Sequence, residues 1–474
     1  MPDGGRCVMA RAIKTVAIAG GGITAWSAAA ALKRRIRALE VVVISSAPPP
    51  DALTDRISNT LPSIAEFHSD IGLSDEDTIV HAGSSIRAGT TFRGWAAGLP
   101  DYTHAYGAYG VPVGGVPFHQ LWLRDYHSRG QPFDSFSPVA VRGSQVGHGL
   151  RLSIPTYRQL MHDYSLHLGV AERGGQIADV GIRGSDGFIE ALVLEGGQRV
   201  EADLFIDCTG PAARVRSSVG GPFEQWNRWL LCDRVIIGAG EAYPESPLLD
   251  EVIATEAGWD WLSPGRSATE AGSVFSSAHR AESGGATFIR QGRLAEPWLR
   301  NCVAIGDAAV MVEPLEWTNL HLAHSQIDRL VAMMPDAQIA PIEVAEYNRQ
   351  CNAEADRIRD FLCMHYLTAR RGEPFWRDAA AVEPPPSLAH SLSLFSERGR
   401  LPYYEEETFA RDSWLAVLFG HGFRPRRIDP LADAVPPEQV ERALASHMGQ
   451  PGDRFSSGQP SYRGSFLQMG QNAQ

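Results

Sequence analysis

The stretch with the clearest chemical meaning is a run of three glycines near the start of the chain. Gly20–Ala25 has the spacing GxGxxA; it follows the apolar run Thr15–Ala19 and precedes the helix-favouring run Trp26–Arg35 and a second apolar run, Glu40–Ile44. In this order of strand, turn, helix and strand, the backbone can approach a pyrophosphate at the helix N-terminus, where free N–H groups point outward. We therefore predict a dinucleotide-binding βαβ unit, with cofactor contacts from Gly20, Gly22, Ile23, Thr24 and Ala25.

Two later segments indicate which dinucleotide is bound. Asp203–Ile206 leads into the small-residue turn Asp207–Gly210, and Asn301–Ile305 leads into Gly306-Asp307. A strand followed by Gly-Asp commonly brings a carboxylate to the ribityl hydroxyls of a flavin, which favours FAD over NAD. Ser45 stands where a ribose-binding acid usually follows the second strand, and its hydroxyl can bind a sugar hydroxyl less strongly than a carboxylate does. We predict that Ser45, Gly306 and Asp307 also contact FAD.

Two tryptophans, Trp259 and Trp261, form the second chemical feature of the sequence. Side chains alternate along a strand, so both indoles would share one face, and Pro264 would end the pairing. A paired indole wall beside a cofactor can exclude one reactant and admit another. Taken alone, the pair favours ordinary core packing, and the flavin motifs around it shift the interpretation toward a wall. Ser263, between the pair and the proline, is a polar group that needs a partner.

Composition excludes several classes of function. The 474 residues carry a formal net charge of −12, which argues against nucleic acid or an anionic membrane as a partner. No apolar run reaches the roughly 18–20 residues of a membrane span, and the N-terminal apolar stretch lacks the pattern of a secretory signal. The six cysteines show no CxxC pairing, as in a reduced cytoplasmic protein. No histidine spacing suggests a metal site, and His365 is interpreted as a core residue.

The predicted elements that position these residues include both β-strands and helices. Ile177–Val180, Phe188–Leu194 and Val200–Ile206 have the pattern of β-strands, and Ala323–Met334 and Val344–Arg370 have that of helices.

The predicted domain organisation has three parts. Residues 1–377 form an FAD-binding module with an interleaved, substrate-facing β region, and residues 378–448 form a mostly helical substrate segment. Residues 449–474, rich in Gly, Ser, Gln and Pro, form a disordered tail.

Taken together and in order, these motifs resemble the flavin-dependent tryptophan halogenase family. The resemblance implies an α/β fold: a PHBH-like FAD-binding module, with its Rossmann-type βαβ unit, and an added, largely helical substrate region. It rests on Gly20–Ala25, Gly115–Pro117, Trp122–Arg124, Trp259–Pro264, Gly272–Ser277, Arg300–Asp307, Glu313–Glu316, His365-Tyr366 and Phe375-Trp376.

The resemblance also implies a chemistry. A separate NAD(P)H-dependent flavin reductase supplies FADH2, and the reduced flavin with O2 oxidises chloride or bromide to hypohalous acid. This oxidant travels through a tunnel to a small aromatic substrate, where a lysine positions it and a glutamate assists the substitution. Trp259 and Trp261 would line the tunnel and block direct monooxygenation. A homodimer is compatible with the sequence, which does not fix the oligomeric state.

Around the tunnel glutamate, some residues of this chain match the family's motif and others differ from it. Glu316 matches that glutamate, whose carboxylate would act as a general base. Thr318 and Asn319 occupy the halide-binding turn beside the flavin, where backbone N–H groups can hold an anion. Trp317 replaces a small residue of the family and adds bulk near the isoalloxazine. Asn319 replaces a glycine and restricts the backbone.

The tunnel lysine is absent. Arg87 takes its position, while Lys14 and Lys33 are the only lysines of the chain and lie far from any plausible tunnel. Arginine stays charged, so Arg87 could donate hydrogen bonds to hypohalous acid or bind an anionic group but is a poor covalent carrier. Gly107 stands where the tryptophan-specific enzymes have a stacking histidine, and Tyr109 keeps an aromatic ring at a neighbouring position. The substrate is therefore expected to be aromatic but different from free tryptophan.

Three hypotheses remain open from the sequence. The first is a halogenase-type enzyme with an unidentified aromatic substrate, favoured by the tryptophan pair, Gly306-Asp307 and Glu316. The second is a flavin monooxygenase or oxidase on the same fold, favoured by the missing lysine and by Trp317. The third is a flavin-binding protein with little catalysis, favoured by the weak ribose contact at Ser45 and by Asn319.

Overall fold

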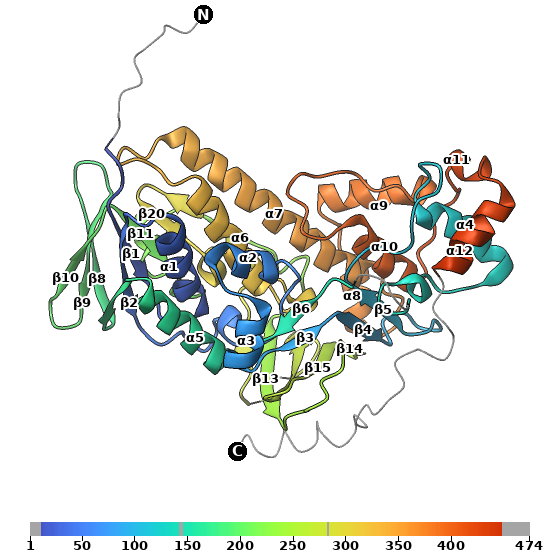
Figure 1. The fold of residues 1–474 in the computed structure, drawn as a ribbon, viewed down its shortest axis with the longest axis horizontal. Coiled ribbons are helices and arrows are strands. Elements are labelled where there is room, and N and C mark those ends of the chain that lie inside the picture. The colour runs from blue at the N-terminus through green and yellow to red at the C-terminus, as the bar shows by residue number, and fades with distance from the viewer. Residues whose placement is uncertain (1–10, 142–145, 282–283, 448–474) are drawn as a thin grey trace, which may run out of the picture.

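The glycine turn belongs to a six-stranded, mostly parallel sheet at one end of the molecule (Figure 1). The computed structural model describes residues 11–141, 146–281 and 284–447. The chain's first strand, β1, is flanked by β11 and β2 and pairs with both in parallel. In spatial order the strands are β19 (Trp298–Leu299), β20 (Cys302–Ala304), β11 (Leu204–Asp207), β1 (Thr15–Ala19), β2 (Glu40–Ser45) and β7 (Ala171–Gly174).

Both faces of this sheet are covered, as its apolar strands require. Val16 and Ile18 of β1 point toward one layer, and Ala17 and Ala19 point toward the other. The first layer consists of the helices α1 (Ile23–Arg35), α5 (Ile154–His167) and α6 (Asn319–Ala332). The second layer is a small antiparallel sheet of β8 (Ile177–Ile182), β9 (Ile189–Leu194) and β10 (Arg199–Glu201).

The predicted βαβ start is confirmed, and one predicted strand is wrong. The run Val200–Ile206 is not a single strand, because β10 ends at Glu201 and β11 begins at Leu204 in a different sheet. Asp203, between them, accepts hydrogen bonds from the backbone N–H groups of Lys14 and Thr15 at 2.9 and 3.0 Å. This side chain anchors the chain where it passes from one layer to the next, a long-range contact that a continuous apolar pattern does not reveal.

The tryptophan pair lies in the middle of a second, seven-stranded sheet. Neighbouring strands pair antiparallel, except β4 and β14, which are parallel. In spatial order the strands are β17 (Thr287–Phe288), β13 (Arg234–Gly240), β16 (Thr269–Phe275), β15 (Gly258–Pro264), β14 (Leu249–Thr255), β4 (Gly89–Arg93) and β5 (Tyr102–Ala105). Smaller sheets join β3 (Ser85–Arg87) to β6 (Gly149–Arg151), and β12 (Phe223–Gln225) to β18 (Gly292–Leu294) and β21 (Val310–Met311).

A long helix, α7 (Pro341–Leu367), connects the parallel sheet to the helical region (Figure 1). It packs against α6 and β19 on one side, and against α8 (Pro374–Ala381) and α9 (Pro386–Arg398) on the other. The remaining helices are α2 (Ile64–Ile71), α3 (Asp75–Ala82), α4 (Phe118–Arg129), α10 (Arg411–Gly420), α11 (Pro430–Asp433) and α12 (Pro437–Ser446). Short 3-10 turns are η1 (Leu53–Asp55), η2 (Phe133–Phe136), η3 (Arg216–Val219), η4 (Gly306–Ala308) and η5 (Leu315–Trp317).

The helical region is assembled from two distant parts of the chain. The predicted substrate segment, 378–448, contains α9 to α12, and α4 from the first third of the chain packs against α11 and α12. The predicted tail, 449–474, lies outside the described residues. Within the described ranges, no helix is long and apolar enough to cross a membrane.

Candidate active site

The glycine turn lies against the ends of both neighbouring strands. Gly20 takes a φ of +126°, and α1 begins at Ile23. A β-carbon on Gly20 would lie 2.5 Å from the carbonyl oxygen of Cys208, just after β11, and one on Gly21 would lie 2.5 Å from that of Ser46, just after β2. Only glycine allows so close an approach. The N-terminus of α1 therefore lies at the carboxyl edge of the parallel sheet, as the sequence predicts.

A single short turn, η1, covers both anchors predicted for the cofactor. Oδ1 of Asp55 accepts a hydrogen bond from the backbone N–H of Ile23 at 2.5 Å, and the carboxylate would overlap a β-carbon on Gly22. Thr54 donates to Asp307 from its backbone N–H at 2.9 Å and from its hydroxyl at 2.8 Å. Burial raises the pKa of Asp55 to about 6 and that of Asp307 to about 7. Residues of the chain itself therefore occupy the positions predicted for a diphosphate and for ribityl hydroxyls.

FAD does not fit this arrangement of the turn. A diphosphate at the N-terminus of α1 would overlap the Asp55 carboxylate and meet a like charge there. The surrounding residues are otherwise suitable. Thr24 lies against Gly306, and a hydrogen bond from Ser45 lowers the pKa of Glu172 on β7. Thus a carboxylate stands beside Ser45 after all, and it comes from a neighbouring strand rather than from the end of β2.

The tryptophan pair forms a buried aromatic wall. Trp259 and Trp261 have no exposed surface, and their ring centroids lie 5.6 Å apart at an angle of 48°. Nε1 of Trp259 donates to the hydroxyl of Tyr366 at 2.9 Å, and that hydroxyl donates to Glu313. Nε1 of Trp261 donates to Glu270 at 3.0 Å. Both indoles are therefore fixed at their polar ends as well as by packing, which confirms the predicted shared face of the strand.

The wall continues into η5 through Trp317. Its ring centroid lies 6.2 Å from that of Trp261, and its Nε1 donates to the hydroxyl of Thr90 at 3.2 Å. Glu316 and Trp317 adopt left-handed backbone conformations, with φ of +62° and +63°. Such angles are costly for bulky residues and persist only where the surroundings enforce them. The strain therefore falls on these two residues and not on Asn319, which is the first residue of α6.

The turn at Thr318 and Asn319, predicted to hold halide, contains two unpartnered polar atoms. The amide nitrogen of Asn319 donates to the carbonyl oxygen of Val312 at 2.9 Å. The hydroxyl oxygen of Thr318 and the amide oxygen of Asn319 are buried and have no hydrogen-bond partner among the described residues. A buried hydroxyl without a partner can donate to an anion. The halide assignment itself stays a prediction.

Glu316 lies between two histidines. Nδ1 of His104 lies 3.0 Å from both carboxylate oxygens, and Nε2 of His365 lies 3.1 Å from Oε1. Burial alone would raise the pKa of Glu316, but His104 and His365 outweigh it and hold the pKa well below its ordinary value. Because an ionised carboxylate can only accept hydrogen bonds, Nδ1 of His104 must carry a proton. His365, interpreted from the sequence as a core residue, is buried but belongs to this polar group.

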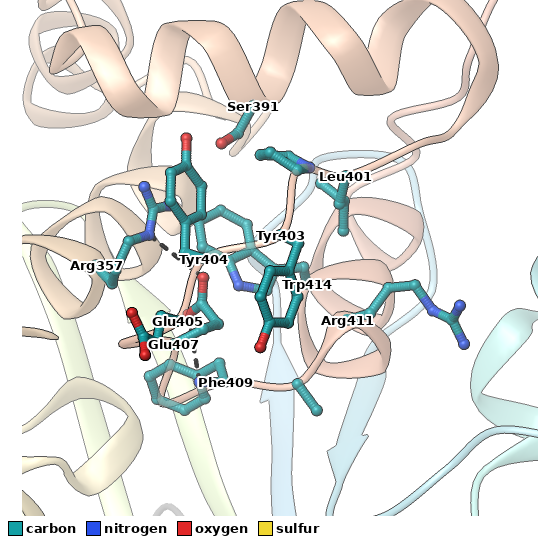
Figure 2. Close-up of a pocket in the computed structure, with 12 residues that line it drawn as sticks. Arg357, Ser391, Leu401, Tyr403, Tyr404, Glu405, Glu407, Phe409, Arg411 and Trp414 are labelled. Carbon is teal, nitrogen blue, oxygen red and sulfur yellow. Dashed lines mark hydrogen bonds and ion pairs between the residues drawn. The ribbon is translucent and has the colours of Figure 1, made fainter.

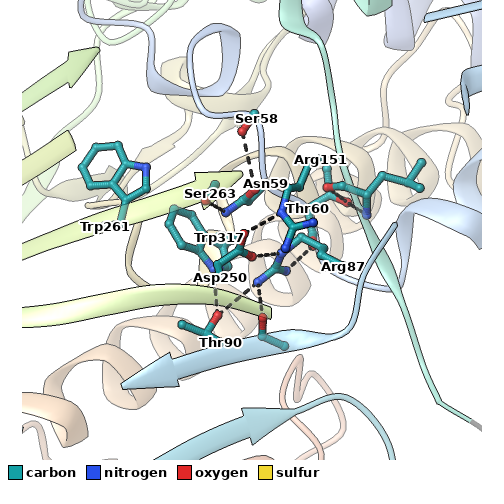
Figure 3. A network of polar contacts seen from close by, with 12 residues as sticks. Ser58, Asn59, Thr60, Arg87, Thr90, Arg151, Asp250, Trp261, Ser263 and Trp317 are labelled. Carbon is teal, nitrogen blue, oxygen red and sulfur yellow. Dashed lines mark hydrogen bonds and ion pairs between the residues drawn. The ribbon is translucent and has the colours of Figure 1, made fainter. Parts of the chain in front are cut away.

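Arg87, at the position of the family's lysine, is fully enclosed. Its guanidinium is ion-paired with Asp250 and also donates to the carbonyl oxygen of Thr60 at 2.8 Å and to the hydroxyl of Thr90 at 3.1 Å (Figure 3). A further hydrogen bond goes to the hydroxyl of Tyr106. Its Cζ also lies 5.7 Å from the centroid of the Trp317 ring. Burial lowers the pKa of Arg87, but Tyr106 and Asp250 outweigh this and raise it. Arg87 therefore stays charged, with its donors committed to protein groups.

A second arginine completes the charged cluster. Nε of Arg151 lies 2.6 Å from Oδ1 of Asp250, so one buried carboxylate holds two guanidinium groups. Beside this cluster, the side chain of Asn59 donates to the hydroxyl of Ser263 at 2.6 Å and supplies the partner that Ser263 was predicted to need (Figure 3).

Two adjacent cavities lie near the Glu316 group. The first has a volume of about 490 Å³ and is lined by Tyr106, Gly107, His321, Phe409 and Arg411, among others. The second has a volume of about 440 Å³ and shares Phe409 to Arg411 with the first (Figure 2). Its other lining residues include Arg357, Ser391, Leu401, Tyr403, Tyr404, Glu405, Glu407 and Trp414.

Aromatic rings separate the cavities from Glu316. Phe409 stacks on Phe361 with centroids 3.9 Å apart, and both rings contact His104, at 6.4 and 6.1 Å. Gly107 lines the first cavity, as expected for a substrate residue. Tyr109, the other predicted substrate residue, lies instead in the core: it is buried, stacks on Phe133 at 5.0 Å, and is absent from the lining of either cavity. Tyr106 supplies the aromatic lining in its place.

The fold and the site define the class of protein first: an oxidoreductase scaffold of the PHBH type, with a glycine turn on a parallel sheet and a second sheet that carries an indole wall. A model of the tryptophan halogenase family matches residues 15–437. The chain belongs to the flavin-dependent tryptophan halogenase family. Enzymes of this family are oxidoreductases that use FAD, which a partner flavin reductase reduces to FADH2.

Individual relatives agree with this assignment. The solved structure of BrvH, a flavin-dependent halogenase from Brevundimonas sp. BAL3, is 32% identical with a TM-score of 0.85, covering 92% of this chain and 95% of that one. A flavin-dependent halogenase from Xanthomonas campestris is 30% identical with a TM-score of 0.86, covering 92% and 94%. The tryptophan 7-halogenase KtzQ from Kutzneria sp. (strain 744) is 26% identical, covering 91% and 93%.

Several residues of the site were missed from the sequence. His104 and His365 flank Glu316, Asp250 and Arg151 enclose Arg87, and Asp55 fills the cofactor turn. No local motif marks Asp55, Arg151 or Asp250, because each acts through a partner far away in the chain. The two histidines gave a usable signal: His104 begins the segment in which substrate residues were predicted, and His365 belongs to one of the segments that carry the resemblance.

Proposed function

We propose that this protein is an FADH2-dependent halogenase-type oxidoreductase that acts on a small aromatic substrate other than free tryptophan. A separate NAD(P)H-dependent flavin reductase supplies the reduced cofactor, and O2 with chloride or bromide completes the reactants. FAD supplies the oxidation when bound. The observation that carries the proposal is Glu316, a buried ionised carboxylate held between two histidines, one of which contacts Phe409 in the lining of the substrate-sized cavities.

The role of Glu316 is to take the proton that an aromatic ring loses on substitution. A carboxylate whose pKa is held low stays ionised at neutral pH but is a weak base. It can take the ring proton because an aromatic ring that carries the positive charge of substitution is itself a strong acid. His104 fixes both oxygens from one side through the proton on its Nδ1. His104 and His365 are therefore positioning residues, and Glu316 is the candidate catalytic residue.

The cavities support an aromatic substrate of indole or phenol size. Their volumes lie within the range of about 300–1,000 Å³ usual for small-molecule sites. Phe409, Tyr106 and Trp414 supply flat apolar walls, and Gly107 contributes only backbone to the lining of the first cavity. We propose that the substrate ring enters beside Tyr106 and that Phe409 moves to admit it toward Glu316.

The test is a reaction of the purified protein with FAD, a flavin reductase, NADH and either bromide or chloride. A panel of indoles, phenols and free tryptophan is screened for halogenated products by mass spectrometry. We expect a brominated or chlorinated indole or phenol, with tryptophan a poor substrate. Absence of any halogenated product across the panel, with FAD binding demonstrated in the same sample, would contradict the proposal.

A second candidate, a flavin monooxygenase, is favoured by the enclosure of Arg87. The family's lysine is absent, and the guanidinium that replaces it is committed to protein partners. Reactions under ¹⁸O₂, with and without halide, distinguish the two activities. Incorporation of ¹⁸O into product without halide supports the monooxygenase, and strict dependence on halide excludes it.

A further inference from the structure

We propose that Asp55 sets the FAD affinity of this chain, because the turn η1 occupies the cofactor's anchors and must withdraw before FAD binds. The inference takes FAD as the cofactor and so rests on the proposed function. It assigns to one residue a role that none of the predicted site residues has.

The first step of the argument is geometric. Asp55 and Thr54 are neighbours in the chain, and between them they take both positions predicted for FAD. Asp55 binds the N–H of Ile23 at 2.5 Å and packs on Gly22, and Thr54 binds Asp307 twice, at 2.9 and 2.8 Å. A flavin dinucleotide cannot use either anchor while η1 stays in place.

The second step is electrostatic. The N-terminus of α1 favours an anion, and the Asp55 carboxylate already neutralises it. Asp51 and Asp307 add acidic charge around the turn, while the positive charge of Arg158 favours the ionised form of Asp55. An incoming diphosphate therefore competes with an internal anion for the same N–H group.

The third step is a population argument. A ligand that binds only the open form has an apparent affinity reduced by the fraction of molecules that are open. A charge-assisted hydrogen bond of the Asp55 type strongly favours the closed form. Weakening that bond should raise the open fraction and tighten FAD binding, although it removes a group from the site.

The test compares the FAD affinity of four full-length proteins by titration calorimetry. These are the wild type, Asp55→Ser, Asp55→Asn and the control Asp51→Asn. We expect Asp55→Ser to bind FAD about ten-fold tighter or more than the wild type, and Asp55→Asn to gain less because an amide oxygen can still accept from Ile23. Asp51→Asn removes a nearby charge without touching Ile23, and we expect its affinity to stay within about two-fold of the wild type.

A second readout follows the turn directly. Without FAD, hydrogen exchange of the Ile23 amide should be slow in the wild type and faster in Asp55→Ser. Thermal melting curves serve as the control that both proteins are folded. Equal FAD affinity in wild type and both Asp55 variants, or an equal gain in Asp51→Asn, overturns the proposal. If none of the four proteins binds FAD, both the role of Asp55 and the proposed flavin-dependent function are contradicted. If FAD binding tightens as expected but no substrate reacts, only the proposed function fails.

Discussion

At the scale of single residues, Glu316 combines complete burial with a charge. Burial disfavours an ionised carboxylate, so its two histidine neighbours must supply the compensation. The left-handed backbone at Glu316 and Trp317 places the carboxylate and the indole on the same short turn. Strain of this kind is often concentrated where a side chain must be held in a functional position.

The first prediction concerns this carboxylate. Glu316→Gln keeps the size of the side chain and removes its ability to accept a proton. We expect product formation to fall by about 10²–10⁴-fold, the usual contribution of general acid–base catalysis. The rate of product formation is measured by mass spectrometry under saturating FADH2. A variant that melts like the wild type and keeps more than half of its rate would remove Glu316 from the chemistry.

The second prediction concerns Arg87. Replacing it by methionine leaves Asp250 paired with Arg151 alone among the residues that the structure describes, in a place that water does not reach. We expect the free energy of unfolding to fall by about 3–5 kcal/mol, measured by urea denaturation. The control is Arg426→Met, which breaks an ion pair with Glu397 on the surface and should cost less than about 1 kcal/mol. Equal effects of the two changes would show that the buried pair contributes nothing special.

At the scale of elements, the indole wall depends on the strand beside it. Gly272 of β16 lies opposite Trp261 of β15, and the indole ring occupies the space where a side chain would be. The carbonyl oxygen of Ile236 on β13 closes the other side. The wall therefore rests on three neighbouring strands, and its position is a property of the sheet rather than of the two tryptophans alone.

The third prediction follows from this packing. Gly272→Ala should displace Trp261 and cost about 1–3 kcal/mol, the usual penalty for overpacking. The near-ultraviolet circular dichroism of the tryptophans should change with it. Gly174→Ala in β7 is the control, because nothing lies within 4 Å of its added carbon. An unchanged dichroism spectrum in Gly272→Ala would mean that the added methyl group does not displace Trp261, contrary to the prediction.

The sequence predicted the βαβ unit to within a few residues, because local periodicity and the glycine turn carry that information. The prediction failed where a contact between distant residues determines the secondary structure. An example is Asp203, at which one apolar run is divided between two sheets. The same limit applies in the site. Glu316 and the tryptophan pair lie in motifs, whereas Asp55, His104 and Asp250 act across gaps of 32, 212 and 163 residues.

At the scale of the whole molecule, several buried carboxyls make stability depend on pH. Burial raises the pKa of Glu313 and of Glu270 to about 7, from 4.5. Between these values the folded state holds protons that the unfolded chain gives up, so the stability that these two groups contribute is full below pH 4.5 and is lost as the pH rises through 7. A shift of this size corresponds to at most about 3 kcal/mol for each group.

The fourth prediction tests this sign with Glu313→Gln, a neutral mimic of the protonated side chain. Between pH 5 and pH 8 we expect the melting temperature of the variant to rise relative to that of the wild type, because only the wild type loses the contribution of protonated Glu313. Glu438→Gln, an exposed carboxyl on α12, should keep the slope of the wild type. A variant slope equal to that of the wild type would mean that Glu313 does not hold its proton in the folded state.

The enclosure of Arg87 has a consequence for protein engineering. An arginine held by Asp250, Tyr106 and two other oxygen atoms cannot be exchanged for lysine by one mutation without leaving several of those groups unsatisfied. Placing an amine at this position therefore requires a redesign of the neighbouring groups as well as of residue 87. A single Arg87→Lys variant changes the packing and the chemistry of the site at the same time.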